Sequence, residues 1–327
     1  MTRRRPWTAG FPLAVVVAGL VGCASAQQTG PVGVPSASAG SPAVSVVDLA
    51  TRSGSWPATQ DTLEAAVEAA TRKCLAAQGF TPPPAPPPAQ PVPEDEAASI
   101  KLADRRANGY GLAPDLSDAG DAPSTLAPSD PYHDRLSATD QRRYRAALFG
   151  SSTLGVRVDL GAGRHVVVPK QGCLAESRRA LAGDVTTWAR LTYLPQTVDD
   201  RLADRASTAP GYLAVLAEWR TCMAGRGHPH PTPRAARDAI RAAYDTVRAG
   251  DRAELRRREI AVAVADGECA TRVHLPAAEL TARRGLVATL PPEERRTLTA
   301  LVARRDVAIV RARAVLAGTG PATAAPR

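Results

Sequence analysis

The side chains best able to do chemistry in this chain are five cysteines and five histidines. Two cysteines and three histidines in the C-terminal half could supply the ligands of a tetrahedral metal site: Cys222, His228, His230, Cys269 and His274. The spacing of His228-Pro229-His230 fits no common zinc motif, and disulfide formation would occupy both thiols. Cys173 with His165 could act as a nucleophile and its base only if the thiol were free. We therefore predict no catalytic residue, no metal and no cofactor.

The first 22 residues have the features of an export signal. Arginines occupy positions 3–5, and an uncharged apolar run covers 11–21. A helix of this run would be only about 16 Å long, too short for a hydrocarbon core of about 30 Å. Leu20-Val21-Gly22-Cys23 looks like a lipobox, the motif at which a lipoprotein signal peptide is cut and the cysteine is acylated. We predict lipidation of Cys23 and attachment to the outer face of the cell membrane; ordinary secretion, with cleavage at Ala24-Ser25-Ala26, is the alternative.

Four cysteines remain after Cys23, and an even number in an oxidising compartment indicates two disulfides. Three pairings can be drawn, and we favour Cys74–Cys173 with Cys222–Cys269. The reason is a repeated pattern: Cys74 and Cys222 each lie near a helix end, five residues before a glycine, and each pairs most simply with the next cysteine.

The charge of the chain is positive, but its pattern does not indicate nucleic-acid binding. The formal net charge is +9, and it falls to +6 without the three arginines of residues 1–22. Nucleic-acid bases stack on aromatic side chains, and only 4% of the residues are aromatic. Export, which the sequence also predicts, argues against a nucleic-acid partner as well. We interpret the arginine clusters as solvent-exposed helix faces, although such faces could attract an anionic wall polymer: Arg256, Arg257, Arg258, Arg304, Arg305, Arg311 and Arg313.

The sequence predicts a mainly α fold, a multi-helix domain with one small β-hairpin at about 155–169, stapled by disulfides. Val156-Arg157-Val158-Asp159-Leu160 alternates apolar and polar residues, and glycines supply the turn. Glycine, proline and polar clusters divide the chain further. The predicted parts are a signal peptide (1–22), a disordered tether (23–58), an N-terminal helical segment with a Pro-rich spacer (59–108), an acidic loop (109–131), a helical domain with the hairpin (132–317) and a disordered tail (318–327).

Several side chains are expected to be structural. Asp61-Thr62-Leu63-Glu64 resembles a capping box, so a helix should run over about 62–77. Pro195 should kink or split the helix that Asp184 begins. The acid pairs Asp199-Asp200 and Glu293-Glu294 are interpreted as solvated helix faces. Trp188 and Trp219 are expected to anchor the core.

Four groups of residues recur in an order that resembles a group of actinobacterial exported lipoproteins with no assigned function: Gly172-Cys173-Leu174-Ala175-Glu176-Ser177, Asp184 with Trp188-Ala189-Arg190-Leu191, Glu218-Trp219-Arg220-Thr221-Cys222-Met223 and Ala265-Asp266-Gly267-Glu268-Cys269. The resemblance covers roughly residues 135–317. It implies a helical disulfide fold and supplies no active site. Pro195 and Pro291-Pro292 depart from the continuous helices that the resemblance implies.

We expect a membrane-anchored cell-envelope lipoprotein that serves as a binding or structural module and does not catalyse a reaction. Its partners would be membrane lipid through Cys23 and a wall polymer or envelope protein, with no nucleic acid; the oligomeric state is left open. An envelope hydrolase with an unrecognised site is the alternative. A solute-binding lipoprotein of a transporter is the second, although the alternating strands and helices of that class are missing.

Overall fold

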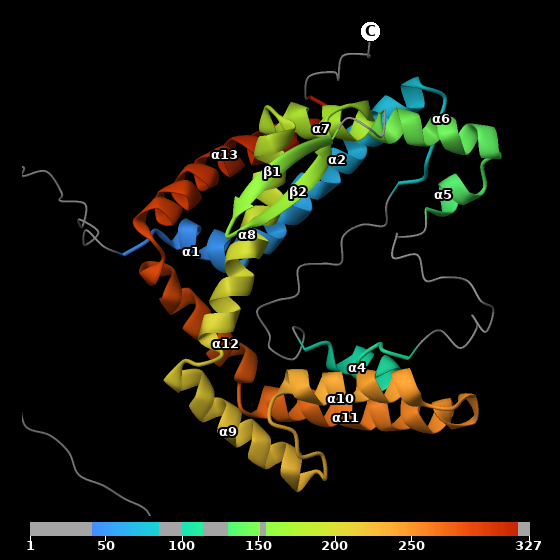
Figure 1. Cartoon of the computed structure of the whole chain (residues 1–327). Coiled ribbons are helices and arrows are strands. Elements are labelled where there is room, and N and C mark those ends of the chain that lie inside the picture. Colours follow the sequence, from blue (N-terminus) through green and yellow to red (C-terminus); the bar gives the residue numbers. More distant parts are fainter. Residues whose placement is uncertain (1–40, 85–99, 114–129, 151–154, 320–327) are drawn as a thin grey trace, which may run out of the picture. The chain divides into compact units, whose positions relative to one another are not determined.

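The computed structural model of the chain describes residues 41–84, 100–113, 130–150 and 155–319. The described residues belong to one compact unit. The described residues are mainly α-helical and contain one two-stranded antiparallel hairpin, which confirms the predicted fold class (Figure 1). None of their helices is both long enough and apolar enough to cross a membrane. The predicted signal peptide, Cys23 and the first part of the tether lie outside the described residues.

Short connections join most of the helices and strands. In chain order they are α1 (Val44–Thr51), α2 (Trp56–Ala77), α4 (Leu102–Asn108), α5 (Pro131–Asp134), α6 (Ala138–Phe149), β1 (Gly155–Gly161), β2 (Arg164–Pro169), α7 (Gly172–Ala182), α8 (Val185–Ala206), α9 (Pro210–Gly225), α10 (Pro233–Thr246), α11 (Arg252–Arg272), α12 (Leu275–Leu286) and α13 (Pro292–Leu316), with 3₁₀ turns η1 (Ala249–Asp251) and η2 (Val287–Thr289).

The hairpin forms where the alternating residues predicted it. Val156 pairs with Val168, and Val158 pairs with Val166, before a register irregularity near the turn. Val158, Leu160 and Val168 are buried, and both strands contact α8. A two-stranded sheet is marginal alone, so packing on α8 is what stabilises it.

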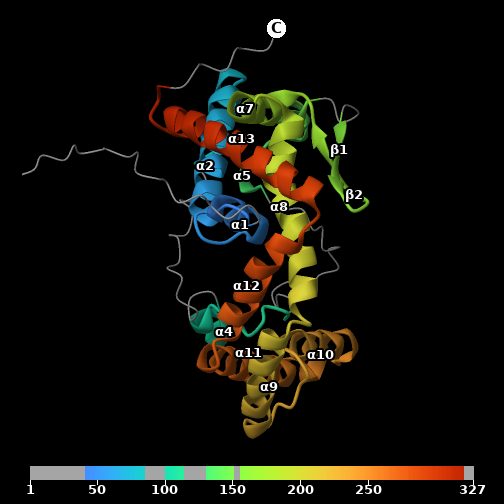
Figure 2. The ribbon, with the colours of Figure 1, turned by 90° about the vertical axis from the view of Figure 1, so that its left-hand side faces the viewer.

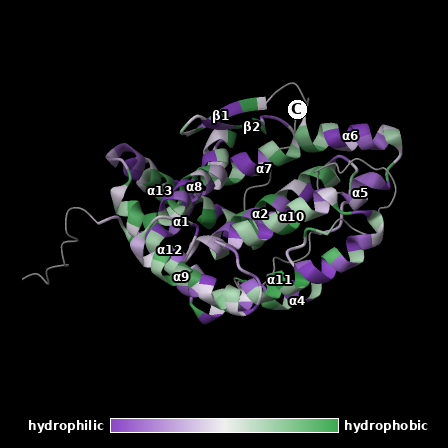
Figure 3. Ribbon diagram, turned by 60° about the horizontal axis from the view of Figure 1, so that its bottom comes forward, coloured by the Kyte–Doolittle hydropathy of each residue, from purple (hydrophilic) through white to green (hydrophobic). Residues whose placement is uncertain are grey.

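The largest hydrophobic cluster joins the two ends of the described chain. It takes side chains from α1, α2, β1, β2, α7, α8 and α13. Figure 2 shows α13 running across α2 and α8, and α13 contacts both helices. Beside this cluster, α6 packs on α7 through Tyr144 and Ala147. Figure 3 shows hydrophilic and hydrophobic residues alternating along α6, as expected of a helix with one buried stripe.

The tether predicted over 23–58 ends earlier than expected. Residues 44–51 form α1, in which Val46, Leu49 and Ala50 are buried against the main cluster. This spacing of three and four residues is that of an amphipathic helix, and the surrounding glycines and serines obscured it. α2 then begins at Trp56 rather than near residue 62. The capping-box prediction is wrong, because Asp61-Thr62-Leu63-Glu64 lies inside α2.

Two further boundaries differ from the prediction. Residues 100–112 are not divided between a free helical segment and an acidic loop, because they lie along α11. Ile100 is buried beside Trp219 and Cys269, and α4 contacts α11. We call residues 100–112 the α11 strap. Pro195 does not split α8, which is continuous from Val185 to Ala206. Most of the predicted spacer, beyond Pro84, and most of the predicted acidic loop lie outside the described residues.

Candidate functional site

All four predicted disulfide cysteines are paired, and the favoured pairing is confirmed. Cys74 on α2 joins Cys173 in the first turn of α7, with a Cα–Cα distance of 5.5 Å. Cys222 on α9 joins Cys269 on α11, with a Cα–Cα distance of 5.8 Å. Since all four sulfurs are bonded and buried, none is a free thiolate for a nucleophile or a metal. Cys23, the predicted lipidation residue, lies outside the described residues.

The residues of the hypothetical metal site are used in other ways. The disulfide holds Cys222 and Cys269, and the backbone of His228 bonds the carbonyl of Met223 at the end of α9. Burial, with help from the charges of His228 and Arg258, lowers the pKa of His230. Within the described residues, no three His, Cys, Asp or Glu side chains group as metal ligands would. His165 lies on β2. Cys173, the thiol considered as its partner in a nucleophile pair, is not free, because it forms the disulfide with Cys74.

The predicted solvated acid pairs divide into exposed and buried members. Asp200, Glu293 and Glu294 form ion pairs with arginines at partly exposed positions. Asp199 is different, because it is buried where α8 meets α12, and its carboxylate lies 2.6 Å from Arg283. Burial raises the pKa of Asp199 although Arg283 opposes the shift. The prediction of a solvated face is therefore wrong for Asp199.

One arginine of the predicted basic face is also buried. Arg305 is 5% exposed, and its guanidinium donates to the Thr59 hydroxyl at 2.9 Å, the Gln60 side chain at 3.1 Å and the Trp56 carbonyl at 3.2 Å. Burial lowers the pKa of Arg305 to about 10. Arg304, Arg311 and Arg313 are exposed. The interpretation of a solvated face holds for these three and fails for Arg305, which pins α13 to the start of α2.

Two buried carboxylates on α11 were not identified from the sequence. Glu259 is fully buried and accepts hydrogen bonds from the backbone of Tyr110 and Leu112 and from the Tyr244 hydroxyl, at 2.8–2.9 Å. Asp266, one heptad later, accepts from Arg105, Tyr110 and Trp219 at 2.7–3.1 Å. Their spacing from each other and from Cys269 places all three on one helix face, which was the available signal. Every acceptor has its donors, so these acids hold the α11 strap and lack a free position for catalysis.

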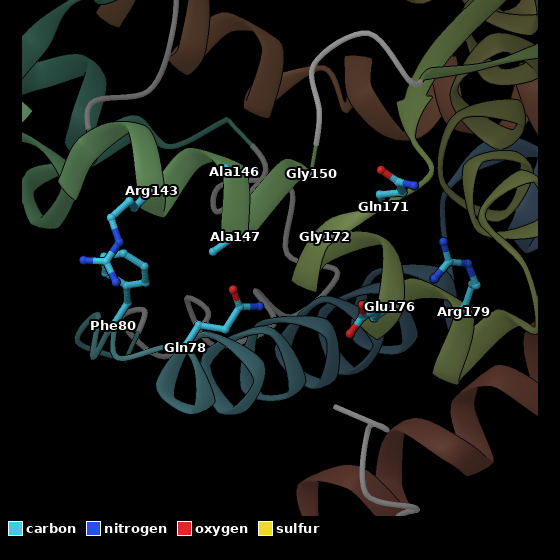
Figure 4. A pocket seen from close by; sticks show the side chains of 10 residues that line it. All are labelled: Gln78, Phe80, Arg143, Ala146, Ala147, Gly150, Gln171, Gly172, Glu176 and Arg179. Carbon is cyan, nitrogen blue, oxygen red and sulfur yellow. The ribbon is translucent and has the colours of Figure 1, made fainter. Parts of the chain in front are cut away.

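A first pocket lies beside the Cys74–Cys173 disulfide, with a volume of about 630 Å³. Figure 4 shows Arg143 next to Phe80 at one end and Arg179 at the other. The Arg143 guanidinium lies 5.6 Å from the centre of the Phe80 ring, and Arg179 donates to the carbonyl of Lys170. Both cations of this pocket therefore already have partners in the chain.

Gly150 and Gly172 close this pocket by direct backbone contact. Gly172 has a φ of +82°, and a Cβ atom there would lie 2.5 Å from the backbone nitrogen of Gly150. Only glycine fits both the backbone conformation and the space. The contact fixes the end of α6 against the start of α7, which also positions the disulfide.

A second cavity is a groove of about 500 Å³ between α2, α6, α7 and α8. We call it the α2–α8 groove. Its walls are largely apolar and aromatic, and they come from Val67 and Leu75 on α2, Tyr144 and Leu148 on α6, Leu174 on α7, and Trp188 and Tyr193 on α8. Trp188 is 3% exposed and belongs to the main cluster, so it is a core residue as predicted and also forms part of the wall.

Trp219, the other tryptophan predicted to anchor the core, lies in a different cluster, where it is fully buried beside Cys222 and Cys269.

The charged side chains of the α2–α8 groove differ in whether they have a hydrogen-bond or ion-pair partner. Glu68 lies 3.5 Å from Arg72, and Glu64 accepts a hydrogen bond of 2.7 Å from Gln60. The Nε atom of Arg178 is shielded from solvent and has no hydrogen-bond partner among the described residues. Burial lowers the pKa of Arg178. Arg178 has no distinguishing signal in the sequence, because only its position next to the buried Ser177 relates it to the core.

Comparison with models of protein families, with curated proteins and with solved structures finds no match to this chain. The resemblance to actinobacterial exported lipoproteins therefore stays a prediction from the residues.

Proposed function

We propose that this protein is a cell-envelope lipoprotein, anchored through acylated Cys23, whose helical unit binds a ligand and does not catalyse a reaction. The observation that carries the binding part is the α2–α8 groove. Its volume of about 500 Å³ is in the range of small-molecule sites, which combine apolar walls with a few polar groups. Arg178 is such a polar group, because the described residues leave its Nε without an acceptor.

The anchor part of the proposal is supported by the sequence and by the state of the cysteines. Leu20-Val21-Gly22-Cys23 follows a short apolar run with arginines before it. Two disulfides hold the helical unit, and disulfides persist in oxidising compartments outside the cytoplasm. A diacylglyceryl group with a further acyl chain would give Cys23 the two lipid signals that stable attachment needs.

The absence of catalysis is proposed because the groups with the most displaced pKa values serve packing. Burial raises the pKa of Tyr110, which donates to Asp266, and of Tyr244, which donates to Glu259. An active site brings such groups together in a cleft where a substrate can reach them. Here they lie in the contacts between α10, α11 and the α11 strap.

Mass spectrometry of the membrane fraction tests the anchor. The mature protein should begin at Cys23 and carry the mass of three acyl chains, and Cys23→Ser should appear without lipid in the soluble fraction. An unmodified N-terminus at Gln27 in the wild-type protein would overturn the anchor.

A further inference from the structure

The α2–α8 groove is lined by Arg178, a cationic side chain. Within the described residues its Nε atom is shielded from solvent and has no hydrogen-bond partner. A buried donor without an acceptor is unfavourable, because it has lost its hydrogen bonds to water. A guanidinium is also built to hold a carboxylate or phosphate through two parallel hydrogen bonds. An anion bound in the groove, which Arg178 lines, would therefore supply an acceptor for this guanidinium.

The other charges of the groove limit how much negative charge the ligand can carry. Glu64, Glu68, Arg72 and Arg178 have formal charges that cancel, and Arg72 is already paired with Glu68. A doubly charged phosphate monoester would be repelled by the two glutamates, while among the described lining residues it would meet only Arg178 as a cation without an ion pair. A group with a single negative charge suits the groove better.

The walls determine the rest of the ligand. Leu75, Leu148, Leu174 and Trp188 line the groove, and most of the surface still open to water belongs to Leu148 and Leu174, because Leu75 and Trp188 are buried. Covering this surface with an apolar body removes it from water and stabilises the complex. The pocket beside the first disulfide offers no comparable site, since Phe80 and the Lys170 carbonyl already engage its two arginines.

We propose that the α2–α8 groove binds an amphipathic monocarboxylic acid, with the carboxylate on Arg178 and the apolar body along Leu174, Leu148 and Trp188. This inference rests on the proposed binding function and names its ligand class. A fatty acid and an aromatic acid share this chemistry, so both are used as probes.

Calorimetric titration of the exported full chain carrying Cys23→Ser tests the pairing without detergent. Decanoate and 2-naphthoate are the charged probes, and methyl decanoate is the neutral one. Decanoate should bind, and methyl decanoate should bind about 10- to 100-fold more weakly, because it cannot form the charge-assisted pair. Tighter binding of 2-naphthoate than of decanoate would show that the groove prefers an aromatic acid to a fatty acid.

Two substitutions separate the role of Arg178 from a general loss of folding. Arg178→Met should weaken decanoate binding about 10- to 100-fold, while its melting temperature stays equal to that of the wild type or rises, because no hydrogen bond is lost. Arg190→Met, at an exposed position of α8, is the matched control and should leave binding unchanged. Equal binding by Arg178→Met and the wild type would overturn the carboxylate pairing.

A blocking variant separates failure of the ligand class from failure of the binding function. Thr192→Trp should fill the groove and abolish binding of every probe. If methyl decanoate binds as tightly as decanoate and Thr192→Trp removes both, the groove binds ligands but the acid assignment is wrong. If no probe binds the wild type, both the ligand class and the role of the groove are overturned. The identity of the anchor at Cys23 is unaffected by either result.

Discussion

At the scale of single residues, Glu259 and Arg305 are buried polar side chains that have several hydrogen-bond partners in the chain. Glu259 accepts from three donors of the α11 strap and α10, and Arg305 donates to three acceptors on α2. Buried polar groups of this kind cost stability only when a partner is removed. Their substitution should therefore affect folding strongly and ligand binding little.

Removing the Glu259 carboxylate should destabilise the fold substantially. Glu259→Ala leaves two backbone N–H groups and one hydroxyl without an acceptor, so we expect a loss of about 3 kcal/mol or more. Tyr244→Phe, which removes one donor together with its hydrogen bond, should cost about 1 kcal/mol. Urea unfolding of the full chain measures both, and a loss for Glu259→Ala no larger than that for Tyr244→Phe would contradict the role assigned to the carboxylate.

Two glycines of the strap provide a matched comparison. Gly109 has a φ of +66°, and a Cβ atom added there would lie 2.7 Å from Cγ of Glu259. Gly111 has a φ of +70°, and a Cβ atom added there would meet nothing within 4 Å. Gly111→Ala should cost about 1–2 kcal/mol through backbone strain alone. Gly109→Ala adds the collision with a pinned side chain, so its midpoint in urea should fall clearly further. Equal midpoints would show that Glu259 can move aside.

At the scale of elements, the sequence predicted those whose signals are local and missed those that depend on distant partners. The hairpin follows from alternating valines and a glycine turn, and the end of α9 follows from the glycine after Cys222. α1 was missed because its apolar face has meaning only against α8, α12 and α13. Arg305 was misplaced for the same reason, since its acceptor Thr59 lies 246 residues away. The α2–α8 groove needs four helices at once, so no single segment could have revealed it.

The connection between α1 and α12 should depend on pH. Asp48 on α1 accepts from Arg284 at 2.8 Å and from the Ser55 backbone at 3.1 Å. Burial alone would raise the pKa of Asp48, but these hydrogen bonds hold it below its usual value of 3.8. A depressed folded-state pKa gives stability that is present above pH 3.8 and is lost as the pH falls through the lower folded-state pKa.

Asp48→Asn tests this dependence. Near neutral pH the variant should be less stable than the wild type, and the difference should shrink once the pH falls below 3.8, because the wild-type carboxyl then also loses its charge. Thermal unfolding at a series of pH values measures the difference. A constant gap across the acidic range would contradict the assignment.

At the scale of the whole molecule, two of the separate hydrophobic clusters of the described residues each contain one disulfide. Cys74 and Cys173 belong to the cluster of Phe80 and Tyr144. Cys222 and Cys269 belong to the cluster of Trp219 and Met223. Opening one disulfide should therefore loosen its own cluster before the rest of the chain.

Removing either disulfide should cost about 4 kcal/mol in the chain-entropy picture, because both loops are long. Cys222→Ser with Cys269→Ser should raise hydrogen exchange in α9 and α11 and leave α2, α8 and α13 protected. Cys74→Ser with Cys173→Ser is the control and should raise exchange in α6 and α7 instead. Uniform loss of protection in both double variants would show that the clusters unfold together.

The pairing of α2 with α13 bears on how the chain is made. α2 ends at Ala77 and α13 begins at Pro292, so at roughly 5–20 residues per second the ribosome delivers the second helix roughly 10–40 seconds after the first. During that interval α2 has no α13 to cover it, and the nascent chain has no means of closing its largest cluster. A chain whose largest cluster closes only after α13 is synthesised stays unfolded until then, and an unfolded chain is the form that the proposed export requires.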